Sequence, residues 1–264
     1  MAKQNNTTTG VLFFVLGMCL VAALAIGVLR ESTLSIAERN EEIFNKRAVL
    51  SSIADKLITP EAEAEGLDGQ DYVADLGDEV VLDIFDRQME QVVINMEGEV
   101  MDGMLAEDID TAKEKKKEEE DRVHPLYIYN GDGEKYYIMS LRGNGLWDEI
   151  WGYVALSNDL NTIVGAAFDH KGETPGLGAE IKDNPWFPEQ FTGKKIYNAE
   201  GQFVSVAVVK GGADKGDYNA VDGLSGATVT ADGVSKMIKN GIQYYLPYFR
   251  KIGKESKPLM GQNN

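Results

Sequence analysis

The feature that most constrains this chain is an uncharged apolar run near its amino terminus. Residues 10–29 read GVLFFVLGMCLVAALAIGVL and contain no charged side chain. A helix of this length measures about 30 Å, which matches the hydrocarbon thickness of a bilayer. The run therefore predicts one membrane-spanning helix after a short tail of residues 1–9, with Cys19 as a small apolar residue of the span.

Two other interpretations of the run stay open at this point. One is a buried helix of a soluble protein, although such helices usually show a polar face. The other is a cleavable signal peptide, because Ala23-Leu24-Ala25 resembles a cleavage site, but the apolar run continues to Leu29. Several basic side chains follow between residues 30 and 47. Taken alone, the positive-inside rule therefore predicts a cytoplasmic main domain.

The composition excludes several classes of function. Of the 264 residues, 43% are hydrophobic, which is enough for an ordinary core in one or two domains. Cys19 is the single cysteine, so no intrachain disulfide and no thiolate metal cluster can form. A formal net charge of -17 would repel nucleic acid phosphates, and two histidines are too few for a histidine-rich metal site. We expect neither nucleic acid binding nor a metal site.

The part between the apolar run and residue 125 shows mixed patterns. Apolar residues at heptad spacing predict an amphipathic helix over Thr33–Leu57, and Thr59-Pro60 should end it before a loop over Pro60–Gly69. Short apolar runs predict strands at Val80–Phe85 and Gln91–Asn95. The mixed-charge run Lys113–Arg122 is typical of a solvated face or linker, and Lys115–Glu119 and Lys116–Glu120 pairs would support a helix there. We expect residues 30–125 to form a helical or mixed region.

From Leu126 the pattern changes to strands. Asn130-Gly131-Asp132-Gly133 predicts a hairpin turn between two short β-type runs. Strand runs followed by one closing helix predict an α+β fold, with a mainly antiparallel sheet and packed helices, over residues 126–250, before a tail of residues 251–264. The expected strands are Leu126–Tyr129, Tyr136–Met139, Trp151–Leu156, Thr162–Phe168 and Phe203–Lys210, and the expected helix is Val229–Phe249.

A turn of small and hydroxyl residues precedes the closing helix. Residues 222–230 read DGLSGATVT and lie between the last expected strand and that helix. Small residues allow backbone amides to approach an anion, and a helix amino terminus offers unpaired donors and the positive end of its dipole. The hydroxyls of Ser225, Thr228 and Thr230 could bind a phosphate. A capping turn without any ligand explains the same residues.

Two motifs resemble those of a known family. Residues 222–230 are similar to the flavin-attachment motif of the FMN-binding domain family, and within it of the C subunits of sodium-translocating NADH:quinone oxidoreductases. Residues 170–178, HKGETPGLG, resemble the loop that lies beside the flavin in that family. The segments 142–147, RGNGLW, and 209–213, VKGGA, resemble two further stretches of the same C subunits.

The resemblance implies one covalently attached FMN. In that family a flavin transferase takes FMN from FAD and esterifies its phosphate to a threonine, which is Thr228 here. No residue would act as an acid or base, and no metal ligand is implied. Instead of contacting the flavin, Trp147 and Leu177 could lie in the core. Lys210 could simply end a strand at the surface. The remaining residues implied to bind the cofactor are Ser225, Gly226, Ala227, Glu173, Thr174, Gly176, Leu177, Gly178, Leu146, Trp147 and Lys210.

The resemblance also implies a function and a location. Such C subunits are anchored by one helix in the bacterial inner membrane, assemble with other subunits, and relay electrons toward quinone as sodium is exported. Their soluble domain lies in the periplasm, contrary to the charge rule above. Two alternatives remain, which are the G subunit of the related ion-translocating ferredoxin:NAD oxidoreductase complex and a non-redox, membrane-anchored assembly module. No dinucleotide-binding glycine motif is present, so NADH should bind elsewhere.

Overall fold

The computed structural model describes residues 4–131 and 133–255, and the chain divides into two compact units, Met1–Asn45 and Lys46–Asn264. The first unit consists of most of one helix, α1 (Gln4–Ser51). Its stretch Thr9–Ser51 contains a window with a mean hydropathy of 2.8 and is long and apolar enough to cross a membrane. The expected apolar helix at this end of the chain is confirmed. The helix expected over Thr33–Leu57 is confirmed as far as Ser51, where it continues the apolar helix as part of α1, and its last turn is the short helix α2 (Ala54–Leu57) after a break at residues 52–53.

The second unit is built on a five-stranded antiparallel sheet whose strands follow one another in chain order. This confirms the expected α+β class with a mainly antiparallel sheet. The first strand lies well before residue 126 in the sequence, yet it pairs with the second strand, in which Leu126 lies opposite Val92. The sheet therefore joins residues from both sides of the expected domain boundary at 126. Its strands are β1 (Met89–Ile94), β2 (His124–Gly131), β3 (Glu134–Asn144), β4 (Glu149–Leu156) and β5 (Ile163–His170).

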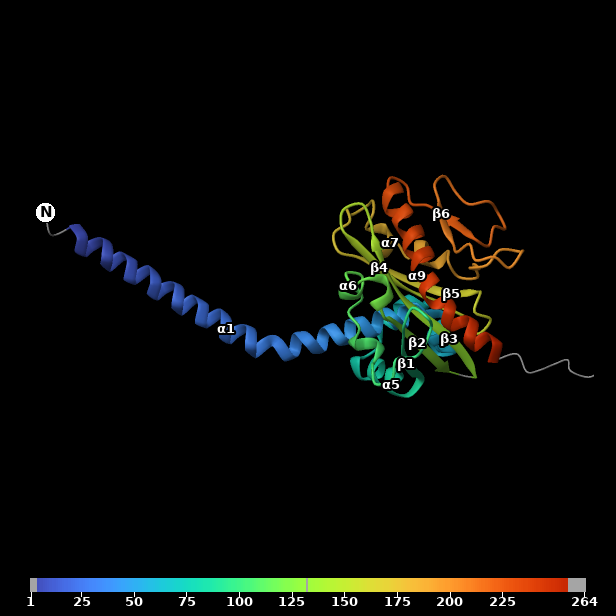
Figure 1. The fold of residues 1–264 in the computed structure, drawn as a ribbon, viewed down its shortest axis with the longest axis horizontal. Helices are drawn as coiled ribbons and strands as arrows, with labels where there is room; N and C mark the ends of the chain where they lie inside the picture. Colours follow the sequence, from blue (N-terminus) through green and yellow to red (C-terminus); the bar gives the residue numbers. More distant parts are fainter. Residues whose placement is uncertain (1–3, 132, 256–264) are drawn as a thin grey trace, which may run out of the picture. The chain divides into compact units, whose positions relative to one another are not determined.

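Hydrophobic clusters cover both faces of this sheet, because alternate side chains of a strand point to opposite sides. Leu126 and Ile128 belong to one cluster, whereas Tyr127 and Tyr129 belong to the other. The closing helix α9 (Thr228–Glu255) packs on the first face against β3 (Figure 1). On the same face α7 (Glu180–Asp183) and α8 (Trp186–Glu189) pack against β5. The second face is covered by the end of α1 and by α4 (Gly69–Asp75), α5 (Asp78–Gln88) and η1 (Ala106–Asp108).

Two expected features of the region before β1 are corrected. Val80–Phe85 is helical, within α5, because only Val81 and Phe85 are buried and these lie one helical turn apart, while Val80 is 47% exposed. The stretch expected to be a loop from Pro60 contains α3 (Pro60–Ala64), in which the hydroxyl of Thr59 accepts a bond from the N–H of Ala62 and Pro60 takes the first helical position.

The mixed-charge run and the strand expected at Phe203–Lys210 also differ from expectation. The run contains the end of α6 (Thr111–Glu114) and η2 (Glu119–Asp121), and Lys115 donates to the amide oxygen of Asn144 at 2.6 Å instead of pairing with Glu119. The expected strand shortens to β6 (Ala207–Val209), which pairs in parallel with β7 (Ala220–Asp222) in a separate two-stranded sheet.

Two glycines allow α9 to approach β3 closely. A Cβ on Gly143 would lie 2.7 Å from the Cβ of Met237, and one on Gly241 would lie 2.7 Å from a methyl group of Leu141. Gly241 weakens the helix by itself, yet it removes the side chain that would separate the helix from the sheet. This packing fixes the position of the whole helix. It therefore also fixes where the first turn of α9 lies, which is where the motif 222–230 ends.

Candidate functional site

A small cavity of about 240 Å³ forms where three separate segments meet. The β3–β4 loop contributes Leu146 and Trp147, and the loop after β5 contributes residues of the stretch 173–178. The third wall comes from the small-residue turn and the first turn of α9, residues 226–230. The fold thus brings the two principal motifs and the GLW segment to one place, although they are far apart in the sequence.

Thr228 is the first residue of α9 and lines the cavity. Its side chain is half-buried, so its hydroxyl is accessible from the cavity. Gly226 precedes it with a φ of 77°, in the left-handed region that glycine adopts without strain. A Cβ on Gly226 would come within 2.7 Å of a methyl group of Leu177. The turn therefore needs glycine both for its conformation and for its contact with the second motif.

The buried carboxylate of Glu173 joins the three walls of the cavity. The side chain is 4% exposed, and its Oε2 accepts a 2.7 Å bond from the hydroxyl of Thr230. Its Oε1 accepts bonds from the backbone N–H groups of Trp147, at 2.9 Å, and Asp148, at 3.4 Å. Burial by itself raises the pKa of Glu173, but these hydrogen bonds outweigh it and hold the pKa below its ordinary value. The carboxylate is consequently ionised and acts as a brace between the motifs.

Glycines on two sides make room for this carboxylate. A Cβ on Gly145 would come within 2.5 Å of the carboxylate Oε1, and one on Gly178 would meet Oε2. The Gly178 Cβ would also lie 2.6 Å from the hydroxyl oxygen of Thr230. Any larger residue at either position would displace the carboxylate. Packing against the Glu173 carboxylate is therefore sufficient to explain why residues 145 and 178 are glycines.

Exposed apolar side chains form the rim of the cavity. Trp147 is 70% exposed, and Leu146, Leu177 and Val229 are also exposed. The indole N–H of Trp147 donates to the hydroxyl of Thr174 at 3.1 Å, which holds the ring over the loop of the second motif. Trp147 and Leu177 are therefore surface residues at a cavity, not core residues, and such exposure of large apolar groups is typical of a binding site.

Some of the implied residues lie outside the lining. Ser225 and Gly176 are exposed and do not line the cavity, and Lys210 follows β6 with its side chain exposed. The hydroxyl of Thr230, a candidate phosphate ligand from the sequence, is bonded to Glu173 instead. His170, the first residue of the second motif, is half-buried, and its Nδ1 accepts a bond from the N–H of Glu173 at 3.2 Å.

Gln190 is a positioning residue that the sequence patterns missed. Its side-chain amide binds the backbone of Asp222 twice: the Asp222 N–H donates to Gln190 Oε1 at 2.9 Å, and Gln190 Nε2 donates to the Asp222 carbonyl at 3.3 Å. The Asp222 carboxylate in turn accepts from the N–H of Ala213 at 2.7 Å. These bonds fix the start of the motif 222–230. No short-range signal could have revealed Gln190, which lies 32 residues away.

Replacing Gln190 with alanine should destabilise the second unit by about 1–2 kcal/mol, because the Asp222 N–H would lose its hydrogen-bond acceptor. Urea unfolding of the full chain, followed by circular dichroism, measures this change. Gln243→Ala is a matched control, because Gln243 is an exposed glutamine on α9. Equal stability of the two variants would contradict the assigned role of Gln190.

Comparison with known proteins agrees with this geometry. Residues 145–243 match the model of the FMN-binding domain family, and the match contains all three walls of the cavity. The chain is 31% identical to the C subunit of Na(+)-translocating NADH-quinone reductase from Vibrio parahaemolyticus over 89% of this chain and 90% of that protein. The protein of the same name from Pseudomonas aeruginosa is 39% identical, but the match spans only 57% of its length and 55% of this chain. The one from Vibrio vulnificus is 46% identical over 41% of its length and 40% of this chain.

Two solved structures have the same fold. The crystal structure of the C subunit of Na(+)-translocating NADH-quinone reductase from Parabacteroides distasonis is 34% identical, with a TM-score of 0.66, and the match covers 87% of this chain and 98% of that one. NqrC from Shewanella oneidensis is 28% identical, with a TM-score of 0.62, over 80% and 99% of the two chains. These findings confirm the family resemblance that the motifs predict.

Proposed function

We propose, from the premise that this chain belongs to the family of the C subunits of Na(+)-translocating NADH-quinone reductase, that it is a membrane-anchored flavoprotein carrying one FMN esterified to Thr228. The observation that carries the proposal is the convergence of the two motifs on one cavity, with Thr228 at its wall and at the amino terminus of a long helix. A helix start next to an accessible hydroxyl suits a phosphate ester, since unpaired N–H donors and the helix dipole favour the negative charge.

The residues present fit a flavin. Its planar ring system has apolar faces, and Leu146, Trp147 and Leu177 offer apolar surface at the rim. The cavity is smaller than the roughly 300–1,000 Å³ of typical enclosed ligand sites, so an FMN held there would stay partly exposed. Partial exposure suits a group that exchanges electrons with neighbouring proteins. When bound, FMN supplies the redox chemistry, and the protein supplies position and electrostatics.

Attachment would require a flavin transferase as a partner. In the proposed transfer the hydroxyl oxygen of Thr228 bonds to the FMN phosphorus of FAD, the phosphoanhydride bond breaks, and AMP leaves with the hydroxyl proton. Ser225, Gly226 and Ala227 would form the turn that presents the hydroxyl, while Glu173, Thr174, Gly176 and Gly178 shape the facing loop. The exposed ammonium of Lys210 would contribute only long-range charge to this site.

The proposed place of this protein is a redox complex of the bacterial inner membrane. There α1 would cross the membrane once, other subunits would surround it, and electrons would pass through the FMN toward quinone as sodium is exported. A covalent bond prevents loss of the cofactor, which is useful if the second unit faces the periplasm, outside the compartment where flavin is made. The relatives described above are named as C subunits of the quinone reductase, which favours this assignment over the G subunit of the ferredoxin:NAD oxidoreductase complex.

Intact-mass analysis tests the proposal. Protein purified from its native membrane should carry the mass of one FMN less water, and its flavin fluorescence should stay with the polypeptide after denaturation. A bare chain would refute the covalent attachment, and absence of any flavin from the native protein before denaturation would leave the non-redox assembly module. Subunits that copurify with the chain would distinguish the two redox complexes.

A further inference from the structure

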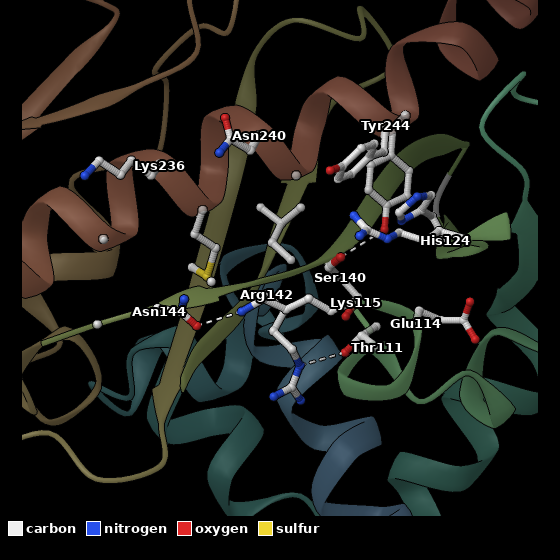
Figure 2. A pocket seen from close by; sticks show the side chains of 18 of the residues that line it. Thr111, Glu114, Lys115, His124, Ser140, Arg142, Asn144, Lys236, Asn240 and Tyr244 are labelled. Atoms are coloured by element: carbon white, nitrogen blue, oxygen red, sulfur yellow. Dashed lines mark hydrogen bonds between the residues drawn. The ribbon is translucent and has the colours of Figure 1, made fainter. Parts of the chain in front are cut away.

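A second and larger cavity, of about 520 Å³, lies between α9, β3 and the segment 111–124 (Figure 2). It shares only Val229 with the smaller cavity described above, and the two are neighbours because Gly145 lines one and Leu146 lines the other. Its volume is within the range of sites that hold small organic molecules, about 300–1,000 Å³. The proposed flavin function leaves it unused.

One stripe of α9 lines this cavity with polar groups. Lys236, Asn240 and Tyr244 follow one another at intervals of four residues and lie along the same side of the helix (Figure 2). Within residues 4–131 and 133–255, the Lys236 ammonium has no ion-pair partner and the Asn240 amide has no hydrogen bond. A cation, an amide and an aromatic ring are thus presented in order along about 12 Å of helix.

The lining is cationic in a chain that is otherwise strongly acidic. Four basic side chains line the cavity against the two carboxylates of Glu114 and Asp232, whereas the chain as a whole carries -17. Glu114 is paired with Lys117 at 2.8 Å and Arg142 with Glu149 at 2.9 Å, so neither of these two counts toward the balance, and Lys115, Arg122 and Lys236 remain against Asp232. Among the residues that the structure describes, Lys115 donates only to the neutral amide of Asn144. The basic residues are Lys115, Arg122, Arg142 and Lys236.

The end of the cavity at Tyr244 is flat and apolar. The ring of His124 stacks on that of Tyr244, with centroids 4.5 Å apart and planes within 8° of parallel. Burial, assisted by the charge of Arg122, lowers the pKa of His124 to about 4, so the stacked imidazole is neutral near pH 7. Leu141 and Met237 add aliphatic surface to the walls. This end offers a planar contact with no net charge.

We propose that this cavity is a second ligand site, which takes a small organic anion with a flat apolar body. Lys236 and Asn240 bind its carboxylate or phosphate, Lys115 adds to the positive potential, and the body packs toward Tyr244. The proposal rests on the lining of this cavity alone and holds whether or not Thr228 carries a flavin.

Calorimetric titration of the full chain in lipid nanodiscs with 2-naphthoate tests this site. We expect saturable binding at one site per chain, at least tenfold weaker in Lys236→Met. Lys239→Met is the matched control, because Lys239 is exposed on the same helix and does not line the cavity; its affinity should stay within twofold of that of the unmodified protein. The uncharged analogue 2-naphthalenemethanol should bind at least tenfold more weakly than 2-naphthoate.

Three results would overturn the proposal. They are the absence of saturable binding, equal affinities of the two lysine variants, and equal affinities for the acid and the alcohol. A Thr228→Val chain provides a further check, since it should bind 2-naphthoate as the unmodified protein does. Loss of binding in that variant would place the probe in the smaller cavity and would count against a second site.

Discussion

Thr228→Val should remove the flavin from the protein completely. Valine has nearly the shape of threonine but no hydroxyl, so no oxygen remains to form the phosphate ester. Thr228 is half-buried at the first position of α9, and the substitution leaves the backbone and most of the side-chain volume unchanged. The fold should therefore persist, while the fraction of chains that carry FMN should fall from complete to zero. Intact mass after co-expression with a flavin transferase measures the change directly.

Two controls separate loss of the attachment atom from indirect damage. Thr228→Ser keeps a hydroxyl at the same position and should retain measurable attachment, reduced by the greater freedom of the serine side chain. Thr192→Val makes the same chemical change at an exposed threonine away from the cavity and should be flavinylated like the unmodified chain. If the Thr228→Val protein kept the added mass of FMN less water, the ester would have to be elsewhere.

Short sequence patterns correctly predicted the β2–β3 hairpin and the start of the last helix, because neighbouring residues determine both. The residues Asn130 to Gly133 specify the β2–β3 hairpin, and Tyr137 lies opposite Ile128 as a tight turn there requires. The small-residue turn before Thr228 likewise indicated the start of the last helix. In both places the signal comes from a few neighbouring residues, so the sequence alone indicates where the element begins or ends.

Other features depend on packing between distant segments. The β-branched residues near Val80 favour a strand, yet burial of Val81 and Phe85 against the sheet stabilises a helix. The bond from Gln190 to Asp222 spans 32 residues, and the bond from Thr230 to Glu173 spans 57. No local pattern encodes these pairs. The motifs therefore identified which segments form the site, while the structure was needed to identify what holds them together.

Glu173→Ala should give the largest loss of stability of any single change at the site, about 3 kcal/mol. It would leave the partly buried Trp147 N–H and the buried Thr230 hydroxyl without an acceptor, and a buried unsatisfied donor costs about 1–3 kcal/mol. The same change would release the β3–β4 loop and the start of α9 from each other, so the fraction of flavinylated chain should also fall. Chemical denaturation and intact mass measure the two effects. Glu200→Ala, at an exposed glutamate, should change neither.

The contribution of Glu173 should depend on pH in a defined direction. The folded-state pKa of Glu173 lies below its ordinary value near 4.5, so the unfolded chain binds this proton more readily than the folded one. The stabilisation is therefore complete above pH 4.5 and is lost as the pH falls through the folded-state pKa. In Glu173→Gln, which does not titrate, the deficit relative to the unmodified protein should be constant at neutral pH and should shrink in acid. A deficit that grew in acid would contradict this assignment.

A double-mutant cycle with Thr230→Val isolates the bond that joins the two motifs. Thr230→Val alone deprives the buried carboxylate of one donor, and Glu173→Ala alone orphans the hydroxyl, so each single change includes a penalty for the partner left behind. The double variant leaves neither group unpaired and should cost about 1–3 kcal/mol less than the sum of the single changes. Additive costs would mean that the bond does not couple the motifs, and the brace between the three walls of the cavity would then reduce to the contacts of Glu173 with the β3–β4 loop.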